Sequence, residues 1–238
     1  MKKNVLFQLL FAGVLFLGTS CSKDDVPNDP KGTVSLNMLN EQNGKTRLGT
    51  SDVYINKANN FYTNSCLISE IGNVGGIGKE VEPRLNNLVR EVAVATGNMY
   101  QVFDAETVFD FPSGTRAIMA GAAYYRFYVV APIAVDDVQT GAIVKYVSVY
   151  PDAQGLPEYG KSLGTVTYVG ETVSMELPKN TECFWYDGVP EVFDISASDG
   201  VLRMTLNRTP TEFNGVPGTY EVYIRLGNVY TSVTVRVN

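Results

Sequence analysis

Apolar and polar residues alternate in short segments along most of the chain after Gly32, and these segments are rich in β-branched and aromatic residues. Glycine, proline, asparagine and aspartate separate the segments at strand-like intervals, and helical periodicity is nearly absent. In segment 219–226, Tyr220, Val222 and Ile224 fall on one face, and segment 229–237 alternates in the same way. The pattern predicts an all-β fold, built as one or more antiparallel β-sandwiches.

Four two-residue sequences between strand-like segments predict tight hairpins. Each combines glycine with asparagine or aspartate, which adopt the positive φ that two-residue hairpin turns require. The four are Gly97-Asn98, Asp187-Gly188, Asp199-Gly200 and Gly227-Asn228.

Segment 84–95 is the one place where a helix competes with a strand. Its apolar residues have helical spacing, and Pro83 suits the first turn of a helix. Residues 92–95, however, alternate as a strand that leads into the turn at Gly97. We expect a short helix or a loop first, and then a strand.

Residues 151–164 collect glycine and proline without periodicity, which indicates either a domain boundary or a long loop within one sandwich. As a boundary, it divides the chain into an N-terminal β domain at 33–160 and a C-terminal domain at 161–238. Seven strands in the C-terminal part are typical of an immunoglobulin-like sandwich. They are expected at 165–169, 172–177, 182–186, 191–196, 201–206, 219–226 and 229–237. Segment 217–224 is similar to the penultimate strand of that fold, in which a tyrosine, here Tyr220, pins a corner.

The first twenty residues read as a signal peptide, with Lys2 and Lys3 ahead of an apolar run at 5–17. A helical run of this length spans about 20 Å, which is too short to cross a hydrocarbon core of about 30 Å. Small residues at 18–20 precede Cys21 and resemble a bacterial lipobox, although Gly18 stands where such boxes usually carry an aliphatic residue. We predict lipidation of Cys21, with ordinary secretion as the alternative.

A tether follows at 21–32, because its charged and proline residues cannot bury a core. Its Ser-Lys-Asp-Asp run at 22–25 resembles the export signal of surface lipoproteins in Bacteroidetes. The resemblance implies a lipid-anchored protein on the outer face of the outer membrane.

Composition excludes several functions. Removal of residues 1–20 takes away Lys2 and Lys3 and leaves 17 basic and 25 acidic side chains, a net charge of −8, so nucleic acid is not an expected partner. The absence of histidine excludes Ser-His-Asp and Cys-His catalysis and histidine-ligated metal sites. We predict no enzyme activity, no cofactor and no metal, while carboxylate chemistry, a Ser-Lys pair and calcium bound by oxygens remain possible.

Two cysteines remain besides Cys21. Cys66 and Cys183 lie far apart in the sequence. They either pair in an oxidising compartment or stay as free buried thiols, and spacing does not decide between the two.

Carboxylates form three clusters along the sequence, each with a catalytic and a structural interpretation. A glycosidase needs two carboxyl groups facing each other across a sugar, which sequence proximity does not establish, and acidic residues are common in turns. Calcium is an alternative at the second cluster, and the glycines at 73–80 favour a flexible loop over a phosphate site. The clusters are Asp104, Glu106 and Asp110, then Asp136 and Asp137, then Glu191 and Asp194.

Aromatic residues gather in two predicted strands, around Phe127 and Phe184. Because neighbouring side chains in a strand point to opposite faces, each run sends some rings to the core and some outward. An exposed ring beside polar groups suits a sugar, whereas buried rings are core packing, which suits Trp185 in particular. The candidate ligand-binding residues are Tyr124, Tyr125, Tyr128, Trp185 and Tyr186.

Segment 34–61, together with CLISEIGNVGGIG at 66–78, GNMYQVFD at 97–104 and YYRFYVV at 124–130, resembles a family of uncharacterised Bacteroidetes lipoproteins, a domain of unknown function. The resemblance covers most of the mature chain and implies no activity. We therefore expect a non-enzymatic surface module that binds glycan or protein. One alternative is a fimbrillin-type assembly subunit that donates strand 230–238 to a neighbour, and another is a carboxylate-based hydrolase.

Overall fold

The computed structural model describes residues 31–37, 46–48, 51–56, 58–208 and 218–238. Strands make up nearly all of the regular structure, and the helical content of this part is one 3-10 turn, η2 (Ala105–Thr107). The predicted signal peptide, Cys21 and residues 22–30 of the predicted tether lie outside the described residues. The strands are β1 (Lys31–Asn37), β2 (Thr46–Leu48), β3 (Ser51–Ile55), β4 (Asn60–Tyr62), β5 (Cys66–Asn73), β6 (Glu91–Ala93), β7 (Asn98–Asp104), β8 (Val108–Asp110), β9 (Arg116–Met119), β10 (Tyr124–Val135), β11 (Val138–Val149), β12 (Lys161–Val166), β13 (Thr172–Glu176), β14 (Glu182–Phe184), β15 (Phe193–Ser198), β16 (Val201–Leu206), β17 (Thr219–Leu226) and β18 (Val229–Val237).

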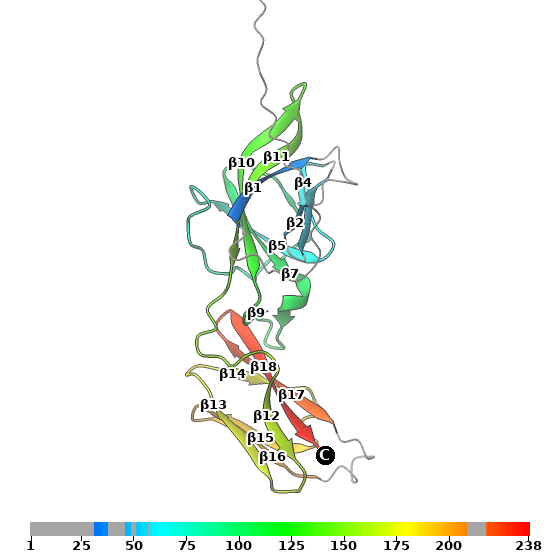
Figure 1. Ribbon diagram of the computed structural model, residues 1–238, viewed down its shortest axis with the longest axis vertical. Helices are drawn as coiled ribbons and strands as arrows, with labels where there is room; N and C mark the ends of the chain where they lie inside the picture. Colours follow the sequence, from blue (N-terminus) through cyan, green and yellow to red (C-terminus); the bar gives the residue numbers. More distant parts are fainter. Residues whose placement is uncertain (1–30, 38–45, 49–50, 57, 209–217) are drawn as a thin grey trace, which may run out of the picture.

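Two sheets form the N-terminal half, at the top of Figure 1. The larger has the order β1-β11-β10-β7-β5, and the smaller has the order β2-β3-β4-β6. Apolar side chains of both sheets share one core, in which the Phe61 ring of β4 lies 4.9 Å from Tyr100 and 6.2 Å from Phe127. The predicted all-β sandwich is confirmed here.

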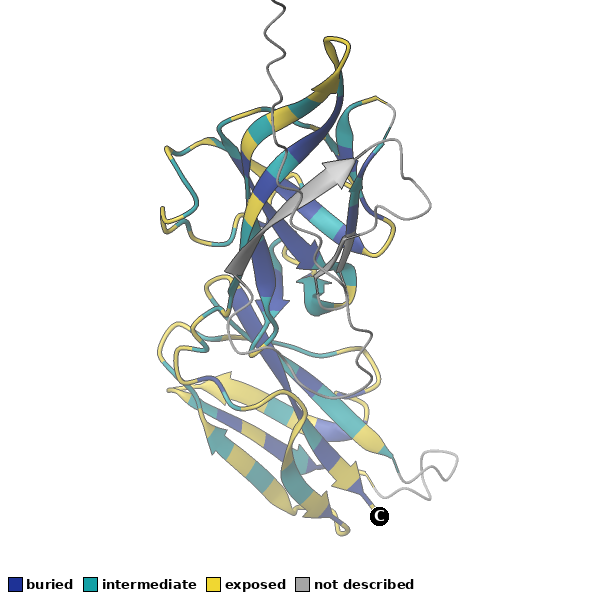
Figure 2. Ribbon diagram, turned by 45° about the horizontal axis from the view of Figure 1, so that its top comes forward, coloured by how far each residue is buried: buried dark blue, intermediate teal, exposed yellow. Residues whose placement is uncertain are grey.

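The C-terminal half contains all seven strands that the sequence predicts there, and the first begins four residues earlier, at Lys161. Lettered A to G from β12 to β18, they form the sheets β13-β16-β15, or B-E-D, and β14-β17-β18, or C-F-G. This arrangement is immunoglobulin-like. In Figure 2, buried and exposed bands alternate along these strands because successive side chains face the core and then solvent.

Two strands from the earlier part of the chain extend the C-terminal sheet. β9 runs parallel to β18, with Ile118 opposite Val229, and β8 pairs with β9. The Ile118 N–H donates to the carbonyl of Asn228 at 2.9 Å. The C-terminal core also includes Phe103 and Tyr124. The division at residue 160 stays a prediction, and hydrogen bonding and core packing both cross it.

Two of the four predicted hairpins form. Asp199-Gly200 joins β15 to β16, with φ of 53° and 72°, and Gly227-Asn228 joins β17 to β18. The Gly97-Asn98 prediction is wrong, because β6 pairs with β4 whereas β7 pairs with β5 and β10. The Asp187-Gly188 prediction is wrong for the same reason, since β14 pairs with β17 and β15 with β16. In both failures the turn carries the chain between sheets.

The hairpin between β10 and β11 was not among the four predicted ones. Asp136 and Asp137, the calcium candidates, have φ of 50° and 63° and form the two-residue turn between β10 and β11. Figure 2 shows the tip of this hairpin as exposed. The two aspartates therefore have a conformational role in the structure.

The ambiguous segment 84–95 begins as a loop. Residues 80–85 have no regular structure, Val89 forms an isolated bridge with Ile68, and β6 follows. Leu85 is buried in the C-terminal core. The apolar residues with helical spacing do not share one face, because Leu88 packs on the same core as Leu85, Val92 packs on the N-terminal core, and Val89 is exposed.

Two further observations complete the fold. In the described part of the chain, no helix is both long and apolar enough to span a membrane. Cys66 and Cys183 are free thiols. Cys66 packs in the N-terminal core and Cys183 against the C-terminal core.

Candidate functional site

Tyr124 and Tyr125, proposed from sequence as ligand-binding residues, are core residues with 2% and 9% of their surface exposed. Tyr124 stacks on Phe103, with ring centroids 5.0 Å apart, and Tyr125 packs in the N-terminal core. Strand β10 begins where the two cores meet, so both of its faces are covered there and adjacent tyrosines are buried on opposite sides. Neither ring presents a face to a ligand.

The other three candidates are more accessible but are not gathered together. Tyr128 is half-buried on β10. Trp185 is half-buried against the C-terminal core. Tyr186 is 56% exposed, and it belongs to a larger aromatic cluster that the sequence did not reveal.

We call this cluster the aromatic face. It covers the side of the β14-β17-β18-β9-β8 sheet that points away from the C-terminal core. On β17, Val222 and Ile224 face the core, so Tyr223 projects to the other side, where it lies opposite Phe184 of β14. The aromatic face consists of Phe109, Phe111, Tyr159, Phe184, Tyr186, Tyr223 and Tyr230.

Ring contacts join these side chains into a single layer. Phe109 stacks on Tyr223, with centroids 4.6 Å apart and an interplanar angle of 15°. Tyr186 meets Phe184 edge to face at 5.2 Å, and Tyr159 meets Tyr230 at 6.1 Å. Edge-to-face and offset contacts of this kind fix aromatic side chains in place. The exposed rings are therefore held on a preformed support.

The layer is graded from buried to exposed. Phe111 and Tyr230 form a buried floor, and Tyr223 is half-buried above it. Tyr159 and Tyr186 stand at the rim, with 42% and 56% of their surfaces exposed. A ligand on this face would contact rigid rings at the rim without displacing the floor.

Hydrogen-bonding groups also lie on the aromatic face. The Tyr223 hydroxyl donates to Glu221 at 2.8 Å. Burial raises the pKa of Tyr223, and this hydrogen bond raises it further. Burial raises the pKa of Tyr230 from the usual 10.0 to about 12. Both phenols are therefore protonated at neutral pH and retain their hydroxyl donors.

An arginine closes one end of the aromatic face. Arg225 pairs with Glu182 at 2.6 Å, and its guanidinium carbon lies 5.8 Å from the centre of the Phe111 ring. Contacts of guanidinium with an aromatic ring and a carboxylate orient the fork of donors. The site therefore combines aromatic surfaces with directed hydrogen-bonding groups.

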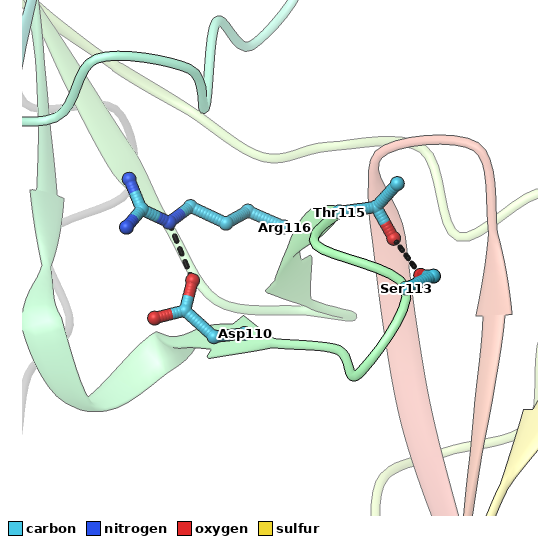
Figure 3. A network of polar contacts seen from close by, with 4 residues as sticks. All are labelled: Asp110, Ser113, Thr115 and Arg116. Atoms are coloured by element: carbon cyan, nitrogen blue, oxygen red, sulfur yellow. Dashed lines mark hydrogen bonds and ion pairs between the residues drawn. The ribbon is translucent and has the colours of Figure 1, made fainter.

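Three aspartates of the carboxylate clusters have hydrogen-bond or ion-pair partners. Asp104 accepts from the Glu106 N–H at 3.0 Å and caps η2, and Asp194 accepts from Asn207 at 3.1 Å. Asp110 pairs with Arg116 across the β8–β9 hairpin (Figure 3). Across the described residues, no group of three or more acidic or cysteine side chains is arranged to hold a metal ion. Turn formation, capping and ion pairing account for these aspartates.

The glycine-rich segment 73–80 is a loop, as the sequence predicted. Gly75 has φ of 81°, and no helix follows whose N-terminus could hold a phosphate. The Lys79 carbonyl accepts a hydrogen bond from Arg126 at 2.6 Å.

Comparison with known sequences identifies one family, described as Domain of unknown function (DUF5036), which matches residues 35–238. This confirms the part of the predicted resemblance that concerns a domain of unknown function. Neither a curated protein nor a solved structure gives a significant match to the chain.

Proposed function

Because the chain belongs to the DUF5036 family, whose function is unknown, we propose a function from the site itself. The protein is a non-enzymatic, lipid-anchored module of the outer cell surface that binds glycan through the aromatic face. The observation that carries this proposal is the graded layer of seven aromatic side chains with Tyr159 and Tyr186 exposed at its rim.

The chemistry of the face suits a sugar. A pyranose ring has C–H groups that pack on an aromatic ring, and hydroxyl groups that need hydrogen-bonding partners. Tyr186 and Tyr159 offer the rings, and Glu221 and Glu182 offer carboxylate oxygens on the same side of the sheet. Tyrosine is well suited to such sites because one end of its side chain is apolar and the other is polar.

The proposed location rests on the N-terminal sequence. Lipid on Cys21 would hold the protein at a membrane, and nine residues separate this cysteine from β1. At no more than about 3.5 Å per residue, they allow the body to stand up to about 35 Å from the lipid. Stable anchoring requires more than one acyl chain. Intact-mass analysis of the native protein tests this part, because an unmodified Cys21 contradicts it.

Non-enzymatic binding is favoured over hydrolysis by the chemistry of the chain. Histidine is absent, and the aspartates that the sequence offered as catalytic candidates serve as turn residues, caps or ion-pair partners. Assembly by strand donation has less support. The suggested donor, β18, pairs with β17 along one edge and with β9 and β12 along the other. It is not a free strand in this structure.

A glycan array probed with the mature protein tests the proposal. For a glycan that the array shows to bind, we expect Tyr186→Ala and Tyr159→Ala each to weaken binding at least tenfold. The matched control is Tyr168→Ala, because Tyr168 is 70% exposed on the loop after β12, outside the aromatic face. Retention of no glycan, capture of a protein partner alone, or equal binding by Tyr186→Ala and the unsubstituted protein contradicts the proposal.

A further inference from the structure

A polar groove of about 750 Å³ lies beside the aromatic face, and we call it the arginine groove. Four parts of the chain line it: Ser69 and Glu70 of β5, the irregular segment around 83–92, the β8–β9 turn at 114–116, and Arg225 and Asn228 at the β17–β18 turn. The Asn228 side chain donates to the Pro83 carbonyl at 3.3 Å and links two of these walls. The volume lies in the range of small-ligand sites, about 300–1,000 Å³.

The groove concentrates positive charge on an acidic protein. Three of the nine arginines in the sequence line it, namely Arg84, Arg116 and Arg225. They come from positions far apart in the sequence, so the fold brings them together. Guanidinium is planar and binds carboxylate through two parallel hydrogen bonds.

The guanidinium groups of Arg84 and Arg116 retain free donors. Arg84 is exposed, and its backbone N–H is held by Gln101 at 2.8 Å. Within the described residues, its side chain has no hydrogen bond or ion pair. Arg116 uses its Nε to bind Asp110, and Figure 3 shows its two terminal nitrogens pointing away from that carboxylate.

The two carboxylates of the groove are engaged elsewhere. Glu91 accepts hydrogen bonds from Asn60 at 2.8 Å and Asn56 at 2.7 Å, and these lower the pKa of Glu91. Glu70 accepts from Asn98 at 2.8 Å. These carboxylates are held by amides, and no ion pair links either of them to a groove arginine within the described residues.

Arg225 is common to both sites. It lines the groove, and on the aromatic face it pairs with Glu182 and lies over Phe111. A ligand that extends along the sheet from the aromatic rings would therefore enter the groove beside this residue. The Asn86 amide and the side-chain oxygen of Asn228 also line the groove and can meet sugar hydroxyls, while the Asn228 amide nitrogen binds Pro83 and the Thr115 hydroxyl binds Ser113 at 2.7 Å.

We propose that the arginine groove binds the carboxylate of an acidic saccharide of the uronate class, whose neighbouring sugars lie on the aromatic face. The inference rests on the proposed function and narrows its ligand. Arg84 and Arg116 contact the carboxylate, and Arg225 forms the boundary between the groove and the rings. The mature chain is net acidic, so selectivity for an anion arises from these local contacts.

Calorimetric titration of the mature protein with tetragalacturonate and with its methyl ester tests the inference, because the two probes have the same sugars and differ at the carboxyl groups, which are charged in one and methylated and neutral in the other. We expect the acid form to bind at least tenfold more tightly. Arg84→Gln and Arg116→Gln should each reduce this ratio about tenfold, and Arg116→Lys should restore only part of it. Arg203→Gln is the matched control, since Arg203 is exposed on β16 of the opposite sheet.

The possible outcomes separate this inference from the proposed function. Equal binding of acid and ester, or no binding of either, overturns the inference, and the proposed function is then decided by the glycan array. If Tyr186→Ala loses binding of both the acid and the ester, and Arg84→Gln loses only the preference for the acid, the result supports both the inference and the proposed function. An unchanged acid preference in Arg84→Gln and Arg116→Gln also overturns the inference.

Discussion

The side-chain oxygen of Gln101 accepts a hydrogen bond from the backbone N–H of Arg84 at 2.8 Å, and Gln101 is fully buried. Its amide nitrogen donates to the carbonyls of Glu82 at 2.9 Å and Val81 at 3.2 Å. One side chain of β7 thus replaces the backbone partners that a regular strand would give segment 81–84. This relationship positions the wall of the arginine groove.

Gln101→Leu should destabilise the protein by about 2–3 kcal/mol, because three part-buried hydrogen bonds to the backbone of segment 81–84 are lost together. Urea unfolding followed by circular dichroism measures the change. Gln139→Leu is the control, since Gln139 makes a single hydrogen bond near the β10–β11 turn, and we expect a change below about 1 kcal/mol. Equal destabilisation by the two substitutions would contradict the importance assigned to Gln101.

The turn at Asp136 and Asp137 offers a stabilising substitution. Both residues have positive φ, which glycine adopts without the strain that an aspartate side chain brings. Asp136→Asn combined with Asp137→Gly should raise the free energy of unfolding by about 0.5–1 kcal/mol. Thermal unfolding measures it. A loss of stability, or a change in unfolding on addition of calcium to the unsubstituted protein, would indicate that these carboxylates have a role beyond the turn.

Stability should fall at alkaline pH because of Tyr230. Below pH 10 this phenol is protonated in both folded and unfolded chains, so it contributes no pH dependence there. Between pH 10 and about 12 the unfolded chain loses the proton while the folded chain keeps it, which favours unfolding.

Urea titrations at pH 9, 10 and 11 measure this effect. Tyr230→Phe should reduce the fall between pH 10 and 11, with a maximum contribution of about 1.4 kcal/mol per pH unit. Tyr168→Phe, in an exposed loop, is the matched control and should leave the slope unchanged. An identical slope in Tyr230→Phe and the unsubstituted protein would show that Tyr230 is not buried as described.

A fragment comprising 161–238 should not fold into a stable domain, although it contains all seven strands of the immunoglobulin-like sandwich. It lacks β8 and β9, so the β18 edge beside Ile118 and the Tyr230 ring beside Phe111 become exposed. We expect aggregation or binding of a hydrophobic dye, whereas a fragment beginning at residue 105 retains these strands. Cooperative unfolding of 161–238 at the midpoint of the whole chain would contradict this expectation.

Six of the seven strands of the C-terminal half could be predicted to within two residues at each end, whereas β12 begins four residues earlier than predicted. Alternation on β16 and β17 is regular because one face of each strand meets a core, and Asp199-Gly200 and Gly227-Asn228 join strands that pair with each other. Local pattern and tertiary partner agree there. Sequence reasoning succeeded at these two turns because β15 and β16, and likewise β17 and β18, are neighbours both in the chain and in a sheet.

The features of the fold and of the site that could not be predicted depend on contacts between segments far apart in the sequence. Gly97-Asn98 has the composition of a hairpin, but the strands on either side enter different sheets. Tyr124 is buried because Phe103 and the C-terminal core lie against it, and no local pattern records that. The aromatic face likewise combines residues from Phe109 to Tyr230. Two local signals pointed to the site: the aromatic run around Phe184 that includes Tyr186, and the alternation on β17, which puts Tyr223 on the face away from the core-facing Val222.

The pairing of β18 has a consequence for the order of assembly. Ribosomes deliver a chain from its N-terminus, yet β9, β12 and β17 all hydrogen-bond to residues 229–237. Each of these three strands therefore has an unpaired edge until residues 229–237 have been synthesised. Unpaired strand edges can pair with other chains. A holding chaperone during synthesis and export would protect the protein at the stage when it is most exposed to misassembly.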